Sequence, residues 1–173
     1  QYCLDEVSDH TMALLLTAAR KTALADKLVK QGRWEMPAVV PIMRFRGKTM
    51  GLVGFGNIAQ LVAVKAQAFG INVIASDPFV KPEVAAAKGV ELVEFDALLE
   101  RSDYVSVHAP LTPATENMFS TDAFAKMKST AFIVNTARGG LIDTTALVAA
   151  LDAGELAGAG LDVLPQEPPA ADD

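Results

Sequence analysis

From Met50 onward, short apolar runs alternate with longer segments in which apolar residues recur at helical spacing. The runs are the length of buried strands, and the segments between them are long enough for crossover helices. Short strands separated by helices are typical of a parallel sheet that is covered on both faces, with right-handed crossovers. The sequence therefore predicts a doubly wound α/β fold. Strands are expected at 49–54, 71–76, 90–93, 103–107, 130–134 and 157–161, and helices at 57–69, 82–88, 96–100, 121–126 and 143–153.

The chain before this pattern is predicted to be one long helix, from about Glu6 to Gly32. Apolar residues at Leu14, Leu15, Ala18, Leu24 and Leu28 form its stripe, and the adjacent Leu14, Leu15 and Leu16 spread apolar surface around it. Such a helix is usually covered on more than one side. We expect a helical segment at 1–35 that joins two subunits, followed by an α/β core at 49–165.

The first predicted strand ends in a glycine turn. Gly54-x-Gly56-x-x-Ala59 lies between this strand and a helix, which is the context that a dinucleotide-binding turn requires. Gly54 permits the tight turn, Gly56 lets a pyrophosphate approach the backbone, and Ala59 lets the helix lie close to the strand. The second strand ends in Asp77, about 20 residues further on. A carboxylate there accepts ribose hydroxyls and repels a 2′-phosphate, which favours NAD over NADP; the alternative is a turn residue that closes a strand.

Three later strands also end in residues that can carry chemistry. The fourth is followed by His108-Ala109-Pro110, the fifth by Asn135-Thr136-Ala137-Arg138-Gly139-Gly140, and the sixth by Asp162 and then Glu167. Ligands of doubly wound sheets bind at the carboxyl ends of the strands. The guanidinium group of Arg138 can bind a carboxylate through two parallel hydrogen bonds. A cation at the start of a helix is disfavoured by the helix dipole, which suggests that Arg138 has a function; the alternative is an ordinary surface arginine.

The other candidates have weaker signals. Taken alone, Asp162 and Glu167 are equally well explained as solvated loop acids. His108 is expected in the wall of the cofactor pocket and not as the catalytic base. His10 is expected to be a structural hydrogen-bonding group, because no second His or Cys lies at metal spacing, and no metal site is predicted.

Composition narrows the class of protein. The chain has 173 residues, about half of them apolar, which suits one soluble domain with its own core. Its net charge of −6 argues against nucleic acid or an anionic membrane as the main partner. The single cysteine, Cys3, excludes a disulfide framework and indicates a reducing, cytoplasmic environment.

Taken together, these motifs resemble the D-isomer-specific 2-hydroxyacid dehydrogenases, the family of phosphoglycerate dehydrogenase and the C-terminal-binding-protein corepressors. The resemblance covers nearly the whole chain and implies a Rossmann-type NAD-binding domain. It rests on the opening segment 2–10, Gly47-Lys48-Thr49, the turn 54–59, Asp77-Pro78, the segments 108–113 and 135–143, Leu161-Asp162-Val163 and Glu167-Pro168.

The resemblance also implies roles for individual residues. Asn57 and Ile58 would contact the pyrophosphate of NAD and Asp77 the adenosine ribose. Arg138 would bind the carboxylate of a 2-hydroxy or 2-oxo acid, and Glu167 would hydrogen-bond a catalytic histidine. The rest of the NAD site would be lined by His108, Ala109, Pro110, Thr136, Ala137 and Asp162, with Asp162 near the nicotinamide carboxamide.

In this family the catalytic histidine belongs to a later Pro-His segment, beyond Asp173. The chain thus resembles the NAD-binding domain of a larger oxidoreductase, without the substrate domain, and we expect it to be inactive alone. The competing expectation is an NAD-sensing corepressor-type module that binds partner peptides. Neither expectation identifies the 2-hydroxy acid, because the residues that contact its side chain would lie mainly in the substrate domain.

Overall fold

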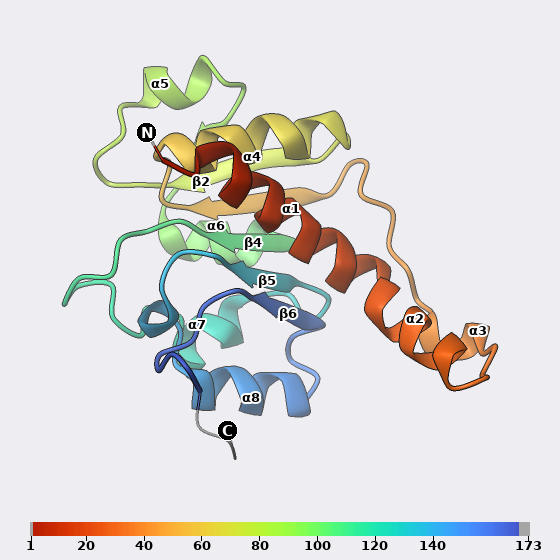
Figure 1. The fold of residues 1–173 in the computed structure, drawn as a ribbon. Helices are drawn as coiled ribbons and strands as arrows, with labels where there is room; N and C mark the ends of the chain where they lie inside the picture. Colours follow the sequence, from red (N-terminus) through yellow and green to blue (C-terminus); the bar gives the residue numbers. More distant parts are fainter. Residues whose placement is uncertain (1, 170–173) are drawn as a thin grey trace.

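The structure is a computed structural model that describes residues 2–169. Its centre is a six-stranded sheet in the order β3-β2-β1-β4-β5-β6, in which every neighbouring pair is parallel (Figure 1). This order confirms the predicted doubly wound fold, because the chain starts in the middle and winds outward in both directions. The strands are β1 (Thr49–Val53), β2 (Asn72–Ser76), β3 (Glu91–Leu92), β4 (Tyr104–Val107), β5 (Phe132–Asn135) and β6 (Gly158–Leu161).

Helices cover both faces of the sheet (Figure 1). One face carries α1 and α4, which pack on each other, and the other carries the consecutive neighbours α6, α7 and α8. The five helices of the sheet domain, which include α5, lie within one or two residues of their predicted bounds. The helices of the sheet domain are α4 (Asn57–Ala68), α5 (Pro82–Ala86), α6 (Phe95–Arg101), α7 (Thr121–Lys126) and α8 (Thr144–Asp152).

Alternate residues of the four inner strands, β2, β1, β4 and β5, enter two separate cores. Along β5, Phe132 and Val134 pack in the core beneath α1 and α4, whereas Ile133 packs in the core beneath α6, α7 and α8. In β1, Met50 and Leu52 point to the first core and Val53 to the second. Side chains of a strand alternate between faces, so a strand covered on both faces must be apolar throughout. This requirement produces the short apolar runs of the sequence.

A long N-terminal helix is confirmed, but its predicted extent, one helix from Glu6 to Gly32, is wrong. The segment forms α1 (Leu4–Arg20) and α2 (Thr22–Lys30), separated by Lys21, whose φ of 54° is left-handed. The buried stripe of α1 ends at Ala19, and in a continuous helix Leu28 would lie about 180° around the axis from it. The break turns α2 so that Leu28 is buried. The leucines assigned to one stripe thus belong to two differently oriented faces.

Two short elements were not predicted. A helix α3 (Met36–Val39) follows α2, and a 3₁₀ turn η1 (Gly139–Leu141) follows β5. Together α2 and α3 project from the body of the domain (Figure 1). Within residues 2–169, no helix is both long enough and apolar enough to cross a membrane.

Candidate functional site

The register of the sheet places the candidate residues in one row. Val53 of β1 pairs with Ser76 and with Val107, and Asn135 pairs with Val107 and with Leu161. The residues that directly follow these strand ends are therefore neighbours along the carboxyl edge of the sheet. They are Gly54, Asp77, His108, Thr136 and Asp162.

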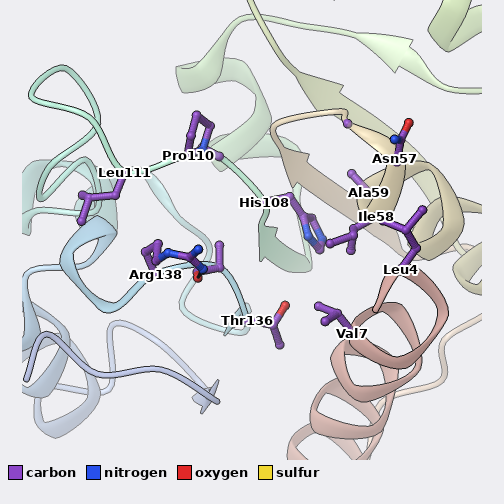
Figure 2. A pocket seen from close by; sticks show the side chains of 13 residues that line it. Leu4, Val7, Asn57, Ile58, Ala59, His108, Pro110, Leu111, Thr136 and Arg138 are labelled. Carbon is purple, nitrogen blue, oxygen red and sulfur yellow. Dashed lines mark hydrogen bonds between the residues drawn. The ribbon is translucent and has the colours of Figure 1, made fainter. Parts of the chain in front are cut away.

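A cleft of about 710 Å³ opens at this edge, where β1 lies beside β4 and the winding direction changes (Figure 2). This is the place and the size expected of a ligand site in a doubly wound sheet. Figure 2 shows Asn57 and Ile58 on one side of the cleft, His108 in the middle, and Thr136 and Arg138 on the β5 side. The lining residues are Leu4, Val7, Gly56, Asn57, Ile58, Ala59, His108, Ala109, Pro110, Leu111, Thr136, Ala137 and Arg138.

The turn after β1 has the geometry of a phosphate cradle. Gly54 has a left-handed φ of 88°, and a Cβ on it would lie 2.9 Å from the backbone of His108 and Ala109. A Cβ on Gly56 would meet no atom within 4 Å, so the space beside it is open. The first N–H groups of α4, from Asn57 and Ile58, have no acceptor among the described residues. An open glycine beside free N–H groups at a helix N-terminus fits a pyrophosphate.

Asp77 is tied to this turn. Its Oδ2 accepts a hydrogen bond from Phe55 N at 2.8 Å, and its Oδ1 accepts one from Phe79 N at 2.8 Å. Each carboxylate oxygen can accept more than one hydrogen bond, so the side chain can still bind hydroxyl groups. Asp77 does not itself line the cleft.

His108 is held as a neutral ring. Its Nε2 lies 2.9 Å from the Ser106 hydroxyl, and burial lowers the pKa of His108 from 6.5 to about 4. A ring that stays neutral at physiological pH can form the wall of a pocket. Its low pKa makes it a weak proton acceptor, which fits the expectation that it is not the catalytic base.

The loop after β5 is shaped by Asn135. The buried Asn135 side chain accepts a hydrogen bond from Ala137 N at 3.0 Å and donates one to Arg138 O at 2.9 Å. This loop presents Arg138 to the cleft, where Nη1 donates to Ala137 O at 2.6 Å. In the described chain no carboxylate forms an ion pair with Arg138, whereas Arg33 pairs with Glu35 and Arg101 pairs with Glu91. Arg138 is thus available for an external carboxylate.

The two acidic candidates lie in the segment after β6. Asp162 lies outside the cleft lining, and its Oδ1 is 3.1 Å from His10 Nε2. Glu167 accepts a hydrogen bond from Leu164 N at 2.9 Å and lines a smaller hollow of about 310 Å³ together with Arg138. The backbone of Leu164 and Pro165 rests directly on Gly139, where a Cβ would collide with it. The small Gly139 therefore lets the Glu167 segment approach the Arg138 loop.

Sequence reasoning missed the contribution of α1 to the site. Leu4 and Val7 line the cleft (Figure 2). Behind them on the same helix, Thr11 Oγ1 lies 2.8 Å from Thr136 Oγ1. Leu111 was also missed as a lining residue. Two polar residues, Ser8 and Thr11, lie in the buried stripe of α1, and Thr11 is the signal in the sequence that could have indicated the contact with Thr136. The expectation that His10 is a structural hydrogen-bonding group stays a prediction; its Nε2 atom lies 3.1 Å from Asp162 Oδ1.

Comparison with known proteins gives a family for this site. Residues 12–173 match the model of the D-isomer specific 2-hydroxyacid dehydrogenase NAD-binding domain. The chain is 46% identical to a chloroplastic D-3-phosphoglycerate dehydrogenase of Arabidopsis thaliana, over 95% of this chain and 26% of that relative. It is 42% identical to a glyoxylate reductase of Thermococcus litoralis, over 95% of this chain and 51% of that relative.

A solved structure has the same fold. The D-lactate dehydrogenase of Lactobacillus jensenii, determined with NAD⁺, superposes with a TM-score of 0.88 at 35% identity, over 96% of this chain and 50% of that one. The chain thus spans between about a quarter and a half of the length of these relatives. It belongs to the D-isomer specific 2-hydroxyacid dehydrogenases, and it is their NAD-binding domain.

Proposed function

We propose that the cleft holds NAD(H) along the carboxyl edge of the sheet. The pyrophosphate would lie on Gly56 and on the free N–H groups of Asn57 and Ile58. Asp77 would accept the adenosine ribose hydroxyls, and His108, Ala109 and Pro110 would form the wall. Thr136, Ala137 and Asp162 would border the nicotinamide half, with Asp162 at its carboxamide.

We infer that the full-length gene product is an oxidoreductase that acts on a D-2-hydroxy acid or the corresponding 2-oxo acid. The cofactor, when bound, supplies or accepts the hydride. The observation that carries this proposal is Arg138, a cation that faces the cofactor cleft without an ion-pair partner in residues 2–169. Its planar fork can bind the substrate carboxylate through two parallel hydrogen bonds, and its charge polarises the neighbouring oxo group.

The base for the substrate hydroxyl would come from outside this chain. Of the two histidines, His10 is engaged with Asp162, and the pKa of His108 is only about 4. Neither is suited to take a proton from a hydroxyl beside the nicotinamide. Glu167, on the segment that rests against the Arg138 loop, would orient and stabilise a histidine of a substrate domain. The chain by itself should bind cofactor without turnover.

The test is a screen of the full-length gene product for NADH oxidation over a panel of 2-oxo acids. Arg138→Lys should lower kcat/KM by about two orders of magnitude or more, because an ammonium cannot replace a planar fork. Arg101→Lys is the matched control, because Arg101 pairs with Glu91 away from the cleft, and its turnover should stay at the wild-type level. No oxidation with any 2-oxo acid, or equal turnover by Arg138→Lys, would contradict the proposal.

The relatives favour the enzyme over a corepressor-type module without physiological turnover. They carry the names of dehydrogenases and a reductase, for 3-phosphoglycerate, glyoxylate and lactate. These names differ in the substrate, so we propose the class, a small 2-hydroxy or 2-oxo acid, and no single member. The single cysteine supports a reducing compartment, for which we propose the cytoplasm.

We also propose that the chain forms a two-fold dimer through its N-terminal helices. The apolar face of α1 is largely covered by its own sheet, with Leu15 fully buried. Exposed apolar side chains gather instead on α2 and the segment after it, which project from the body (Figure 1). They are Leu24, Val29, Trp34, Met36, Val40 and Met43. A concentration of exposed apolar side chains on one projecting segment favours a self-complementary contact that includes α2.

A further inference from the structure

Helix α1 reaches the nicotinamide side of the proposed site through two polar contacts. His10 Nε2 lies 3.1 Å from Asp162 Oδ1, and Thr11 Oγ1 lies 2.8 Å from Thr136 Oγ1. The helix packs against both β5 and β6, whose carboxyl ends carry Thr136 and Asp162. The helix that precedes the sheet therefore borders the same half of the cleft as the last two strands.

Stability does not explain the contact between His10 and Asp162. The two side chains are 49% and 47% exposed, and ion pairs with such exposure contribute little to folding. The carboxylate with the contacts that stabilise the fold is that of Asp103. Asp103 is buried and accepts hydrogen bonds from Thr49 N and Lys48 Nζ at 3.0 and 3.1 Å. The contact between His10 and Asp162 is therefore notable for its place, at the carboxyl end of β6 beside the cleft, and not for its contribution to folding stability.

The contact with His10 orients the side chain of Asp162, whose backbone is already held in place by the sheet. Asp162 N donates to Asn135 O at 3.0 Å, which holds the main chain at the end of β6. Among residues 2–169 the Asp162 carboxylate has one polar side-chain partner, His10, whose Nε2 atom lies 3.1 Å from Oδ1. Oδ2 remains able to accept a hydrogen bond. The Nε2 atom of histidine donates in the protonated form and in one neutral tautomer, so the contact does not require a charged ring.

We propose that His10 is a positioning residue for the nicotinamide ring. Through the contact between its Nε2 atom and Oδ1 of Asp162, it orients the carboxylate so that Oδ2 accepts a hydrogen bond from the carboxamide N–H₂ group. This inference rests on the proposed placement of NAD(H), in which Asp162 meets the carboxamide. A charged acceptor held in one orientation binds its donor more tightly than one that must first be ordered.

Binding of two ligands to the 173-residue chain separates positioning from general support of the fold. NADH carries the nicotinamide, and ADP-ribose is the same molecule without it. By calorimetric titration, His10→Ala should weaken NADH binding by about three- to tenfold, the effect of losing one charge-assisted contact. Its affinity for ADP-ribose should not change. His10→Gln, whose amide can also donate to Oδ1, should recover part of the NADH affinity. Thr17→Ala, at an exposed position of the same helix, should change neither affinity.

Three results would overturn the inference. Unchanged NADH affinity in His10→Ala would show that Asp162 needs no orientation. Equal losses for NADH and ADP-ribose would show that His10 supports the helix and not the carboxamide. If the wild-type chain bound NADH no more tightly than ADP-ribose, the fault would lie in the proposed placement of the nicotinamide itself, and this outcome is visible before any variant is made.

Discussion

At the scale of single residues, Asp77 connects the glycine turn to the choice of cofactor. Its carboxylate accepts hydrogen bonds from Phe55 N and Phe79 N, and its negative charge would repel the 2′-phosphate of NADPH. We expect the wild-type chain to bind NADH more tightly than NADPH. Asp77→Asn removes the charge but keeps an acceptor, so it should narrow the difference between the two affinities.

Calorimetric titration of both cofactors checks this, together with the free energy of unfolding. Asp77→Ala should narrow the affinity gap as well, and should also cost about 0.5–1.5 kcal/mol of stability, because the part-buried N–H group of Phe55 loses its acceptor. An unchanged ratio of NADH to NADPH affinity in Asp77→Asn would mean that the carboxylate does not face the ribose.

His108 should make folding stability depend on pH in the acidic range. Its pKa is about 4 in the folded chain and ordinarily 6.5, so the unfolded chain binds the extra proton between these values. The stability contribution of the neutral ring is therefore complete above about pH 6.5 and is lost as the pH falls toward about 4. The shift corresponds to at most about 3 kcal/mol, and to less because the ring keeps some contact with solvent.

Urea denaturation at about pH 7 and about pH 4 compares the wild type with His108→Gln, in which this group does not titrate. The carboxylates titrate equally in both proteins, so their contribution cancels. The wild type should lose more stability than the variant on acidification. Parallel losses would show that His108 is not held neutral by the fold.

Local patterns predict single residues only where the spacing along the chain carries the information. Gly54, Gly56 and Asp77 follow from the order strand, turn, helix and strand. The contacts of Thr11 with Thr136 and of His10 with Asp162 join opposite ends of the chain. They depend on the angle at which α1 crosses the sheet, and no short-range pattern encodes that angle.

At the scale of elements, the turn η1 and the segment after β6 fit together only because Gly139 lacks a side chain. A Cβ there would collide with the backbone of Leu164 and Pro165, which cannot move independently of Glu167. We expect Gly139→Ala to cost about 1–3 kcal/mol in the free energy of unfolding, as overpacking does elsewhere. If the segment moves instead, its displacement should appear as changed amide signals at 163–167.

Gly140→Ala is the matched control. The added Cβ would meet only the end of the Leu111 side chain, at 3.1 Å, and that side chain can rotate. Its cost by chemical denaturation should be clearly smaller. Equal stability and unchanged signals in both variants would contradict the close packing of the Glu167 segment on Gly139.

Periodicity predicted the strands and most helices but not the break at Lys21. The alternation of buried strands and crossover helices repeats along the whole sheet domain, so each element supports the assignment of the next. Residues 20–22 contain neither glycine nor proline, the usual signals of a break. The helix ends there because its apolar positions change face, a feature that a count of leucines does not reveal.

At the scale of the whole molecule, the exposed surface on α2 and after it should form the dimer contact. Val29 is 53% exposed and Trp34 is 84% exposed. Light scattering after size exclusion should give the mass of a dimer for the wild type and of a monomer for Val29→Asp. Val148→Asp, equally exposed at 51% on α8, should remain a dimer. A monomeric wild type at high protein concentration would contradict the proposed contact.

The most direct test of the cleft as the NAD site is to map NADH binding on the chain by amide chemical-shift perturbation. Because the strand ends lie in register, we expect the shifted signals to lie along the carboxyl edge of the sheet. They should include Gly54–Ile58, Asp77–Phe79, His108–Leu111, Thr136–Arg138 and Asp162. The loop at Arg44–Arg46, which precedes β1 at the opposite edge, should not respond. Shifts confined to that edge, or no shifts at saturating NADH, would contradict the assignment of the cleft as the NAD site.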